Sequence, residues 1–197
     1  GRFFLSAAAD KLKSRNTMAV RVGNRAGLEY VVNTAQQSGF PAFTRPSGPT
    51  IYLGTWEASP LEVASAYTAF ANGGVRPTPF IIESITDSAG RVVWQNTPSA
   101  TRIYSRNTAV AVSSILQQIT KPGGTAGSMQ RLGFKFPCGG KTGTTNSNSD
   151  GWFMGFTPNL VSGVWVGGEE RDIHFDNMRD GQGAEMALPI WGLYMNK

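Results

Sequence analysis

A short run of the sequence, residues 138–145, combines a lysine with hydroxyl groups and small residues. Two glycines come directly before Lys141, so another group could approach the backbone closely at that point. Lys141 would supply positive charge, and the hydroxyls of Thr142 and Thr144 would donate hydrogen bonds to a terminal carboxylate. Gly143 again leaves the backbone open, so an extended peptide could pair with it as an added strand. The run therefore predicts a site that captures a peptide carboxylate.

Two other interpretations of the same run are weak. Gly140, Lys141 and Thr142 match the end of a phosphate-binding loop, but the glycine that this motif needs five residues earlier is Lys135. Cys138 and Lys141 have the spacing of a nucleophile and its lysine base, yet on a strand positions i and i+3 point to opposite faces. The intervening glycines argue against a helix there. We therefore expect neither a nucleotide site nor a cysteine nucleophile.

The chain has one cysteine, Cys138, and one histidine, His174. This composition excludes a disulfide framework and a cysteine-based zinc site. We expect Cys138 to be a small buried residue, and His174 to be a surface or packing residue and not a general base. Asp176, Asp180 and Glu185 match no metal-binding template. The sequence predicts no metal and no cofactor.

Length and composition are those of a soluble globular chain. The 197 residues fit one domain, and 40% are hydrophobic. The formal charge is +5, but lysine and arginine are scattered, so nucleic-acid binding is not predicted. A mild basic excess would suit an anionic cell wall or lipid surface. No apolar run approaches the ~20 residues of a membrane helix.

Helix signals occur along most of the chain. Apolar spacing predicts helices over residues 17–22, 28–38 and 184–196. The clearest start is Ser59, which can cap a helix with Pro60 at its first position and Glu62 completing a capping box. In that helix Leu61 and three later residues are expected to share one face: Ala64, Tyr67 and Ala71. Ser105 is expected to cap a helix over 106–119.

Strand signals fall into two groups. Residues 80–86 and 91–95 read as a hairpin, since a turn sequence joins them. Residues 138–144, 151–156 and 160–167 read as three further strands, the last two joined by a turn at 157–159. The order of elements is helices, then strands, then a closing helix.

Four passages of the chain resemble the C-terminal part of the transpeptidase domain of class A, high-molecular-weight penicillin-binding proteins. They occur in the family's order and span nearly the whole chain: residues 14–20, 59–74, 123–126 and 140–158. The tail from Val164 onward is also similar to this family.

Members of this family carry three motifs, Ser-x-x-Lys, Ser-x-Asn and Lys-Thr-Gly. The resemblance implies that Ser14-Arg15-Asn16 is the second motif and Lys141-Thr142-Gly143 the third. Ser105-Arg106-Asn107 has the same letters as the second motif, but it is typical of a helix cap. No serine in the sequence is followed by lysine three positions later, so the nucleophilic serine is not in this chain.

The resemblance also implies a role for each matched residue. Ser14 would relay a proton to the leaving group, Asn16 would hold the substrate amide, and Lys141 would set the electrostatics. The backbone N–H of Thr144 would be half of an oxyanion hole whose other half belongs to the absent serine. We therefore expect the isolated chain to be catalytically inactive. These roles require residues 14, 16 and 141 to line one cleft.

The fold implied by the resemblance is α/β of the α+β type, the penicillin-binding and β-lactamase-like transpeptidase fold. It would have an antiparallel sheet flanked by helices, an edge strand that carries Lys141, and a missing N-terminal part. Residues 1–197 would form a partial transpeptidase domain, the tail end of a larger protein.

The implied function is cross-linking of peptidoglycan stem peptides that end in D-Ala-D-Ala, and β-lactams would bind at the same site. The parent bacterial protein would be membrane-anchored in the cell envelope, facing the periplasm or the exterior, and would also hold a glycosyltransferase domain. Two alternatives stay open. One is a serine β-lactamase or D,D-carboxypeptidase, and the other is a non-catalytic fragment that binds peptide or β-lactam.

Overall fold

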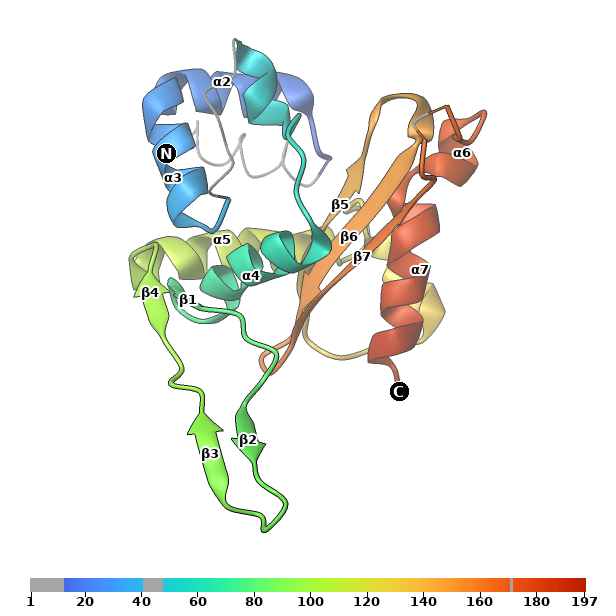
Figure 1. Ribbon diagram of the computed structural model, residues 1–197. Helices are drawn as coiled ribbons and strands as arrows, with labels where there is room; N and C mark the ends of the chain where they lie inside the picture. Colours follow the sequence, from blue (N-terminus) through green and yellow to red (C-terminus); the bar gives the residue numbers. More distant parts are fainter. Residues whose placement is uncertain (1–12, 41–47, 171) are drawn as a thin grey trace.

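The computed structural model describes residues 13–40, 48–170 and 172–197, and Figure 1 shows its elements. The helices and helical turns are α2 (Asn16–Ala26), α3 (Leu28–Gln37), η1 (Pro49–Leu53), α4 (Pro60–Ala71), α5 (Arg106–Ile119), η2 (Gly127–Leu132), η3 (Asn146–Asn148), α6 (Met178–Gly181) and α7 (Gly183–Met195). The strands are β1 (Val75–Pro77), β2 (Ser84–Thr86), β3 (Val92–Gln95), β4 (Ala100–Arg102), β5 (Gly139–Thr144), β6 (Asp150–Phe156) and β7 (Val161–Gly167).

The central sheet contains β5, β6 and β7 in that order, and each neighbouring pair is antiparallel. The three predicted strands are confirmed, and the strand that carries Lys141 lies at the edge of this sheet. Helices α4 and α5 pack on one face of the sheet and α7 packs on the other (Figure 1). This is the mixed helix and antiparallel-sheet architecture that the sequence predicts.

A tryptophan on the closing helix organises the main core. Trp191 of α7 is fully buried and packs edge-on against Phe153 of β6, with 5.1 Å between ring centroids. Its indole N–H donates to the carbonyl oxygen of Ser162 at 3.2 Å. Gly155 makes room for the indole, because a Cβ there would lie 2.5 Å from Trp191. The burial of large aromatic surface is the main source of stability in this layer.

Helix α4 begins as predicted, with Ser59 and Glu62 forming a capping box. The Ser59 amide donates to the Glu62 carboxylate at 2.7 Å, and the Glu62 amide donates to the Ser59 hydroxyl at 3.2 Å. The Ser59 amide and then the Ser59 hydroxyl, which donates to the same carboxylate at 2.9 Å, lower the pKa of Glu62. Of the four residues predicted to share one face, Leu61 in the first turn is 60% exposed, whereas the other three are half-buried.

The smaller strands form two separate ribbons. β1 pairs with β4, and β2 pairs with β3 in the hairpin that extends away from the body in Figure 1. The predicted hairpin strands were too long, since residues 80–83 form no strand and β2 begins at Ser84. The apolar side chains of this hairpin are exposed, so no packing against the body favours longer strands. The pairing of β1 with β4 was not predicted.

Helices α2 and α3 with η1 form a small helical lobe above α4 and α5 (Figure 1). The first helix runs to Ala26, four residues beyond the predicted end. Val32 and Ile51 form the buried centre of this lobe, apart from the main core. Across the ranges given above, no helix is both long enough and apolar enough to span a bilayer.

Candidate active site

The lobe and the sheet meet where the two predicted motifs lie. The ammonium Nζ of Lys141 donates a hydrogen bond to Oγ of Ser14 at 2.9 Å, across 127 positions of sequence. Ser14 stands just before α2, and Lys141 stands in the middle of β5. Two of the residues expected to line one cleft are therefore in direct contact.

The lobe presents Ser14 through an unusual backbone conformation. Its φ is 53°, in the left-handed region that a side chain other than that of glycine rarely adopts. The side chain is exposed at the start of α2. Asn16 is the first residue of α2 and is also exposed, and its side-chain amide has no hydrogen-bond partner among the described residues. A strained backbone like that of Ser14 is typical of functional sites.

Lys141 is held on the α5 side of the sheet. Its ammonium group makes a second hydrogen bond to the carbonyl oxygen of Thr142 at 2.6 Å, and its side chain is half-buried. A lysine on a strand is otherwise free to move, so the two bonds restrict where its charge can lie.

The two threonine hydroxyls lie on the opposite face of β5 from Lys141, as strand alternation requires. Thr142 donates to the hydroxyl of Thr125 at 3.0 Å. Thr144 accepts a hydrogen bond from the amide of Gly183, the first residue of α7, at 3.0 Å. A ligand could therefore meet Lys141 and these hydroxyls together only at the edge of the strand.

The backbone of β5 is open along that edge. The amide of Thr145 donates to the carbonyl oxygen of Asp150, so this opposed pair is hydrogen-bonded to β6. Bonded and non-bonded pairs alternate in antiparallel strands, so the N–H of Thr144 points away from β6. The same alternation turns the N–H and C=O of Thr142 to the edge. Among the described residues no strand pairs there.

The glycines of this strand have a different role from the predicted one. A Cβ at Gly140 would lie 2.6 Å from the Phe153 ring, and a Cβ at Gly139 would lie 2.5 Å from the Phe156 ring. The space beside these glycines is therefore filled by the protein's own aromatic residues. The glycines allow the sheet to pack, and the open edge of β5 offers the approach to its backbone.

A strained turn fixes the far end of β5. Ser147 and Asn148 both have positive φ, at 61° and 58°. The carboxylate of Asp150 accepts hydrogen bonds from the hydroxyls of Thr145 and Ser149 at 2.8 and 3.1 Å. These bonds hold the chain in a turn that its residue types disfavour, and they keep the amide of Thr144 at the sheet edge.

Other sequence-based assignments can also be compared with the structure. Ser105 caps α5, since its hydroxyl accepts from the Thr108 amide at 3.1 Å, which confirms the cap interpretation. Cys138 is half-buried with its sulfur 3.5 Å from the sulfur of Met129, and burial raises the pKa of its thiol. His174 is exposed.

Two contacts of the site were not predicted. Thr125 and Gly183 each hold one threonine of β5, and neither carries a motif of its own. Thr125 belongs to a passage that resembles the family, which was the available signal. Nothing in the sequence marked Gly183.

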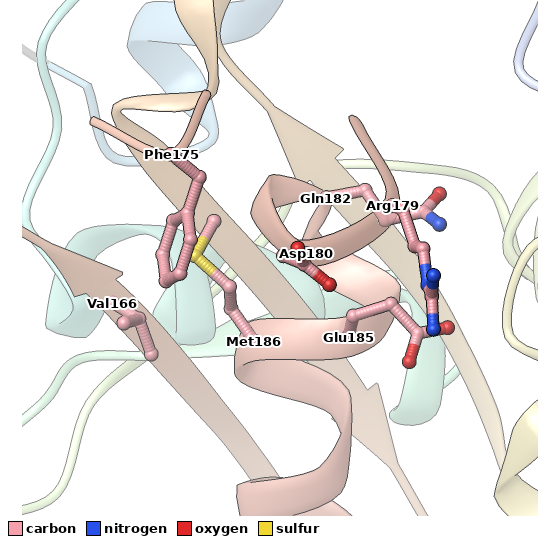
Figure 2. A pocket seen from close by; sticks show the side chains of 7 residues that line it. All are labelled: Val166, Phe175, Arg179, Asp180, Gln182, Glu185 and Met186. Carbon is pink, nitrogen blue, oxygen red and sulfur yellow. The ribbon is translucent and has the colours of Figure 1, made fainter. Parts of the chain in front are cut away.

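A cavity of about 600 Å³ lies elsewhere, beside the start of α7. Figure 2 shows its apolar wall and its charged rim. None of the predicted site residues is among the residues that line it, which are Val166, Phe175, Arg179, Asp180, Gln182, Glu185 and Met186. It is separate from the contact between Ser14 and Lys141.

The chain is similar to known proteins over most of its length. The family described as "Penicillin binding protein transpeptidase domain" matches residues 12–168. Penicillin-binding protein 1A of Neisseria lactamica is 37% identical over 194 residues, covering 92% of this chain and 23% of that protein. Penicillin-binding protein 1A of Pseudomonas aeruginosa is 29% identical and covers 93% of this chain and 28% of that protein. The chain thus spans about a quarter of the length of these relatives.

Solved structures share the fold. Penicillin-binding protein 1A from Haemophilus influenzae superposes with a TM-score of 0.83 at 28% identity, covering 92% of this chain and 32% of that one. Penicillin-binding protein A from Mycobacterium tuberculosis, solved as an imipenem acyl-enzyme complex, gives 0.73 at 20% identity, over 94% of this chain and 46% of that one. The second likeness shows the fold alone. With a family match over most of its residues, the chain belongs to the penicillin-binding protein transpeptidase domain family and is a homologue of the class A penicillin-binding proteins 1A.

Proposed function

We propose that this chain is part of a serine D,D-transpeptidase that cross-links peptidoglycan stem peptides ending in D-Ala-D-Ala. The observation that carries the proposal is the 2.9 Å contact between Lys141 Nζ and Ser14 Oγ at the open edge of β5. A lysine and a serine in direct contact can pass a proton, and an open strand edge can hold an extended peptide.

The positions of these atoms support a role for each residue in the proposed reaction. Ser14 accepts from Lys141, and among the described residues nothing accepts its own proton, so it can donate that proton to a leaving amine. The positive charge of Lys141 favours the carboxylate of the stem peptide and restrains the Ser14 hydroxyl. Asn16, exposed beside Ser14, would hold the amide of the substrate.

The strand backbone would bind the substrate and stabilise the oxyanion. The N–H of Thr144 faces the open edge, where a developing oxyanion could accept its hydrogen bond. The Thr144 hydroxyl accepts a bond from Gly183 and so can still donate its proton to a substrate carboxylate. Thr142 would assist through its edge-facing backbone, because its hydroxyl already donates to Thr125. Gly143, between Thr142 and Thr144, has no side chain that could obstruct a peptide at this edge.

The nucleophile must come from outside this sequence, because no serine here is followed by lysine three positions later. Loss of a single oxyanion donor costs about 10²–10³ in rate, and loss of the nucleophile costs more. The 197-residue chain is therefore inactive by itself. Its natural setting would be a membrane-anchored protein of the bacterial envelope that also holds a glycosyltransferase domain and whose site β-lactams acylate.

The test is a chimera in which this chain replaces its matched segment of the Neisseria lactamica protein. We expect a fluorescent penicillin to acylate the chimera, and Lys141→Ala to slow acylation by about 10²-fold or more. Lys197→Ala is the matched control, because it removes an exposed lysine at the end of the chain. Equal acylation of the Lys141→Ala and Lys197→Ala chimeras would refute the proposed role of Lys141.

The isolated chain gives a second, independent measurement. It should form no covalent adduct with the fluorescent penicillin, and a stable adduct would show that it carries its own nucleophile. Calorimetry with a D-Ala-D-Ala peptide then tests the alternative of a non-catalytic binding fragment. A chimera that binds this peptide but never acylates would favour that alternative. A chimera that hydrolyses penicillin rapidly would favour a β-lactamase.

A further inference from the structure

Contacts near both ends of the helical lobe of α2, η1 and α3 join it to the rest of the molecule. At the start of α2 is the bond from Lys141 to Ser14. At the end of α3, Ser38 contacts Tyr104, which follows β4, and Gly39 contacts Arg76 of β1. Figure 1 shows these elements. The lobe has its own small core around Val32 and Ile51, separate from the main core, so contacts at its two ends can influence how it sits on the body.

The first part of this joint is a buried hydrogen bond. Ser38 is 5% exposed, and its hydroxyl donates to the carbonyl oxygen of Thr34 at 2.7 Å. A hydroxyl has one proton, so Ser38 must accept the 2.9 Å bond from the Tyr104 hydroxyl. Tyr104 stacks on Phe70 at 5.3 Å between centroids, and Phe70 packs against the main core. The bond therefore ties the end of α3 to the body.

The second part is an arginine placed over a glycine. Gly39 has φ +110°, and a Cβ there would lie 2.6 Å from Nη1 of Arg76. The same Nη1 lies 3.4 Å from the Ser65 hydroxyl of α4. Its cation stands just beyond the C-terminus of α3, where the helix carbonyls carry partial negative charge. Nε of Arg76 is buried and has no partner among the described residues, so the guanidinium is confined there without full compensation.

We propose that Tyr104 and Arg76 are positioning residues that hold Ser14 within reach of Lys141 from the opposite end of the lobe. Helices are stiff, and α2 is about 16 Å long at 1.5 Å per residue. A tilt of a few degrees at the joint therefore moves Ser14 by roughly 1 Å, enough to break a hydrogen bond. The consequence for acylation rests on the function proposed above, but the positioning itself does not.

The direct test is the reactivity of the Lys141 amine in the full chain, measured by brief acetylation and mass spectrometry. In Tyr104→Phe only the hydroxyl is lost, and Lys141 should label about two- to tenfold faster, the change expected when one ordinary hydrogen bond is removed. Ser14→Ala sets the value reached when the serine oxygen is gone. Lys197 of the same molecule is the internal reference.

The controls separate positioning from general loosening. Tyr194→Phe removes the hydroxyl of an exposed tyrosine and should leave Lys141 labelling unchanged. Ser38→Ala removes the same bond from the other side, so it should reproduce Tyr104→Phe, and the double variant should add nothing further. Arg76→Lys should raise labelling as well, because an ammonium group cannot fill the site of a guanidinium. Labelling of Lys141 that stays at the unmodified value in both Tyr104→Phe and Ser38→Ala would overturn the proposal.

Acylation of the chimera distinguishes the two proposals. If Tyr104→Phe slows acylation while Lys141 labelling is unchanged, the positioning role is wrong and the transpeptidase function stands. If labelling rises but the unmodified chimera is never acylated, the joint positions Ser14 as described and the proposed function fails.

Discussion

Ser14 combines a functional contact with an unfavourable backbone conformation. Its φ of 53° costs a residue with a Cβ about 1–2 kcal/mol relative to glycine. Its hydroxyl accepts from Lys141, so the residue type suits the site and not the local backbone. The hydrogen bond with Lys141 is therefore formed by a residue whose backbone is strained, as is typical of functional sites.

This conflict can be measured by comparing two substitutions at one position. Ser14→Gly and Ser14→Ala both remove the hydroxyl, but only glycine adopts the left-handed backbone without strain. We expect Ser14→Gly to be more stable than Ser14→Ala by about 1 kcal/mol in urea unfolding. Equal unfolding midpoints for the two variants would show that the backbone at position 14 relaxes out of this conformation.

Tyr67 gives the fold a dependence on alkaline pH. Burial raises its pKa from 10.0 to about 12, since the phenolate form loses solvation inside the protein. Below pH 10 both the folded and the unfolded chain hold the proton, so stability is unaffected. Between pH 10 and pH 12 the unfolded chain loses the proton first, so stability falls by about 1–2 kcal/mol. We predict that Tyr67→Phe removes this part of the alkaline loss, measured as the unfolding free energy at pH 9 and pH 11.5.

At the same scale, the family resemblance predicted that Ser14 and Lys141 line one cleft, but it predicted neither their direct contact nor all of its surroundings. The motif residues are recognisable because chemistry dictates their types. Thr125 and Gly183 are not recognisable in this way, because only the tertiary fold brings the Thr125 hydroxyl and the first residue of α7 next to β5. The glycines of β5 were predicted to let another group approach, but the rings of Phe153 and Phe156 from the neighbouring strand β6 fill that space, and the sequence did not indicate this packing.

At the scale of elements, α7 and β5 are fitted to one another through Gly183. A Cβ at this position would lie 2.2 Å from the carbonyl oxygen of Gly143 and 2.6 Å from that of Trp152. The amide of the same residue donates to the Thr144 hydroxyl. The start of α7 therefore sets both the packing of the sheet and the orientation of Thr144.

We predict that Gly183→Ala destabilises the chain by about 1–3 kcal/mol, because the start of α7 must move away from β5. Gly48→Ala is the matched control, since a Cβ at Gly48 meets nothing within 4 Å. Thermal unfolding of the two variants checks the prediction. If Gly183→Ala unfolds at the temperature of Gly48→Ala, α7 is not fixed to the sheet by this contact.

Elements with strong local signals were predictable and those formed by distant pairing were not. Ser59 and Ser105 predict the starts of helices α4 and α5, because capping depends on residues within one helical turn. Strands β6 and β7 follow from short apolar runs between turns. The ribbon of β1 with β4 joins residues 75–77 to 100–102, and such short segments carry no local pattern that identifies a partner. The exposure of Leu61 was not predictable for a related reason, because periodicity does not say where the neighbouring element ends.

At the scale of the whole molecule, the chain leaves apolar surface and strand edges uncovered. The hairpin of β2 and β3 extends from the body (Figure 1), and Val93 on β3 is 62% exposed. Ile81, in the segment that leads into β2, is 95% exposed. Both of its strands are edges of a two-stranded sheet. Exposed apolar residues beside open strand edges favour association with other chains.

We therefore predict that the 197-residue chain self-associates through this hairpin. Sedimentation velocity should show a coefficient that rises with protein concentration, and sulfate should strengthen the association because apolar contacts drive it. Replacing Ile81 and Val93 by lysine should weaken association, since buried ammonium groups would have to lose their hydration. Ala89→Lys adds charge at the polar turn of the same hairpin and should have a much smaller effect. A chain that sediments as a monomer at every concentration would show that it does not self-associate. If Ala89→Lys weakens association as much as the Ile81 and Val93 changes do, the contact does not depend on these exposed apolar side chains and lies elsewhere, because only contact through them distinguishes the two kinds of position.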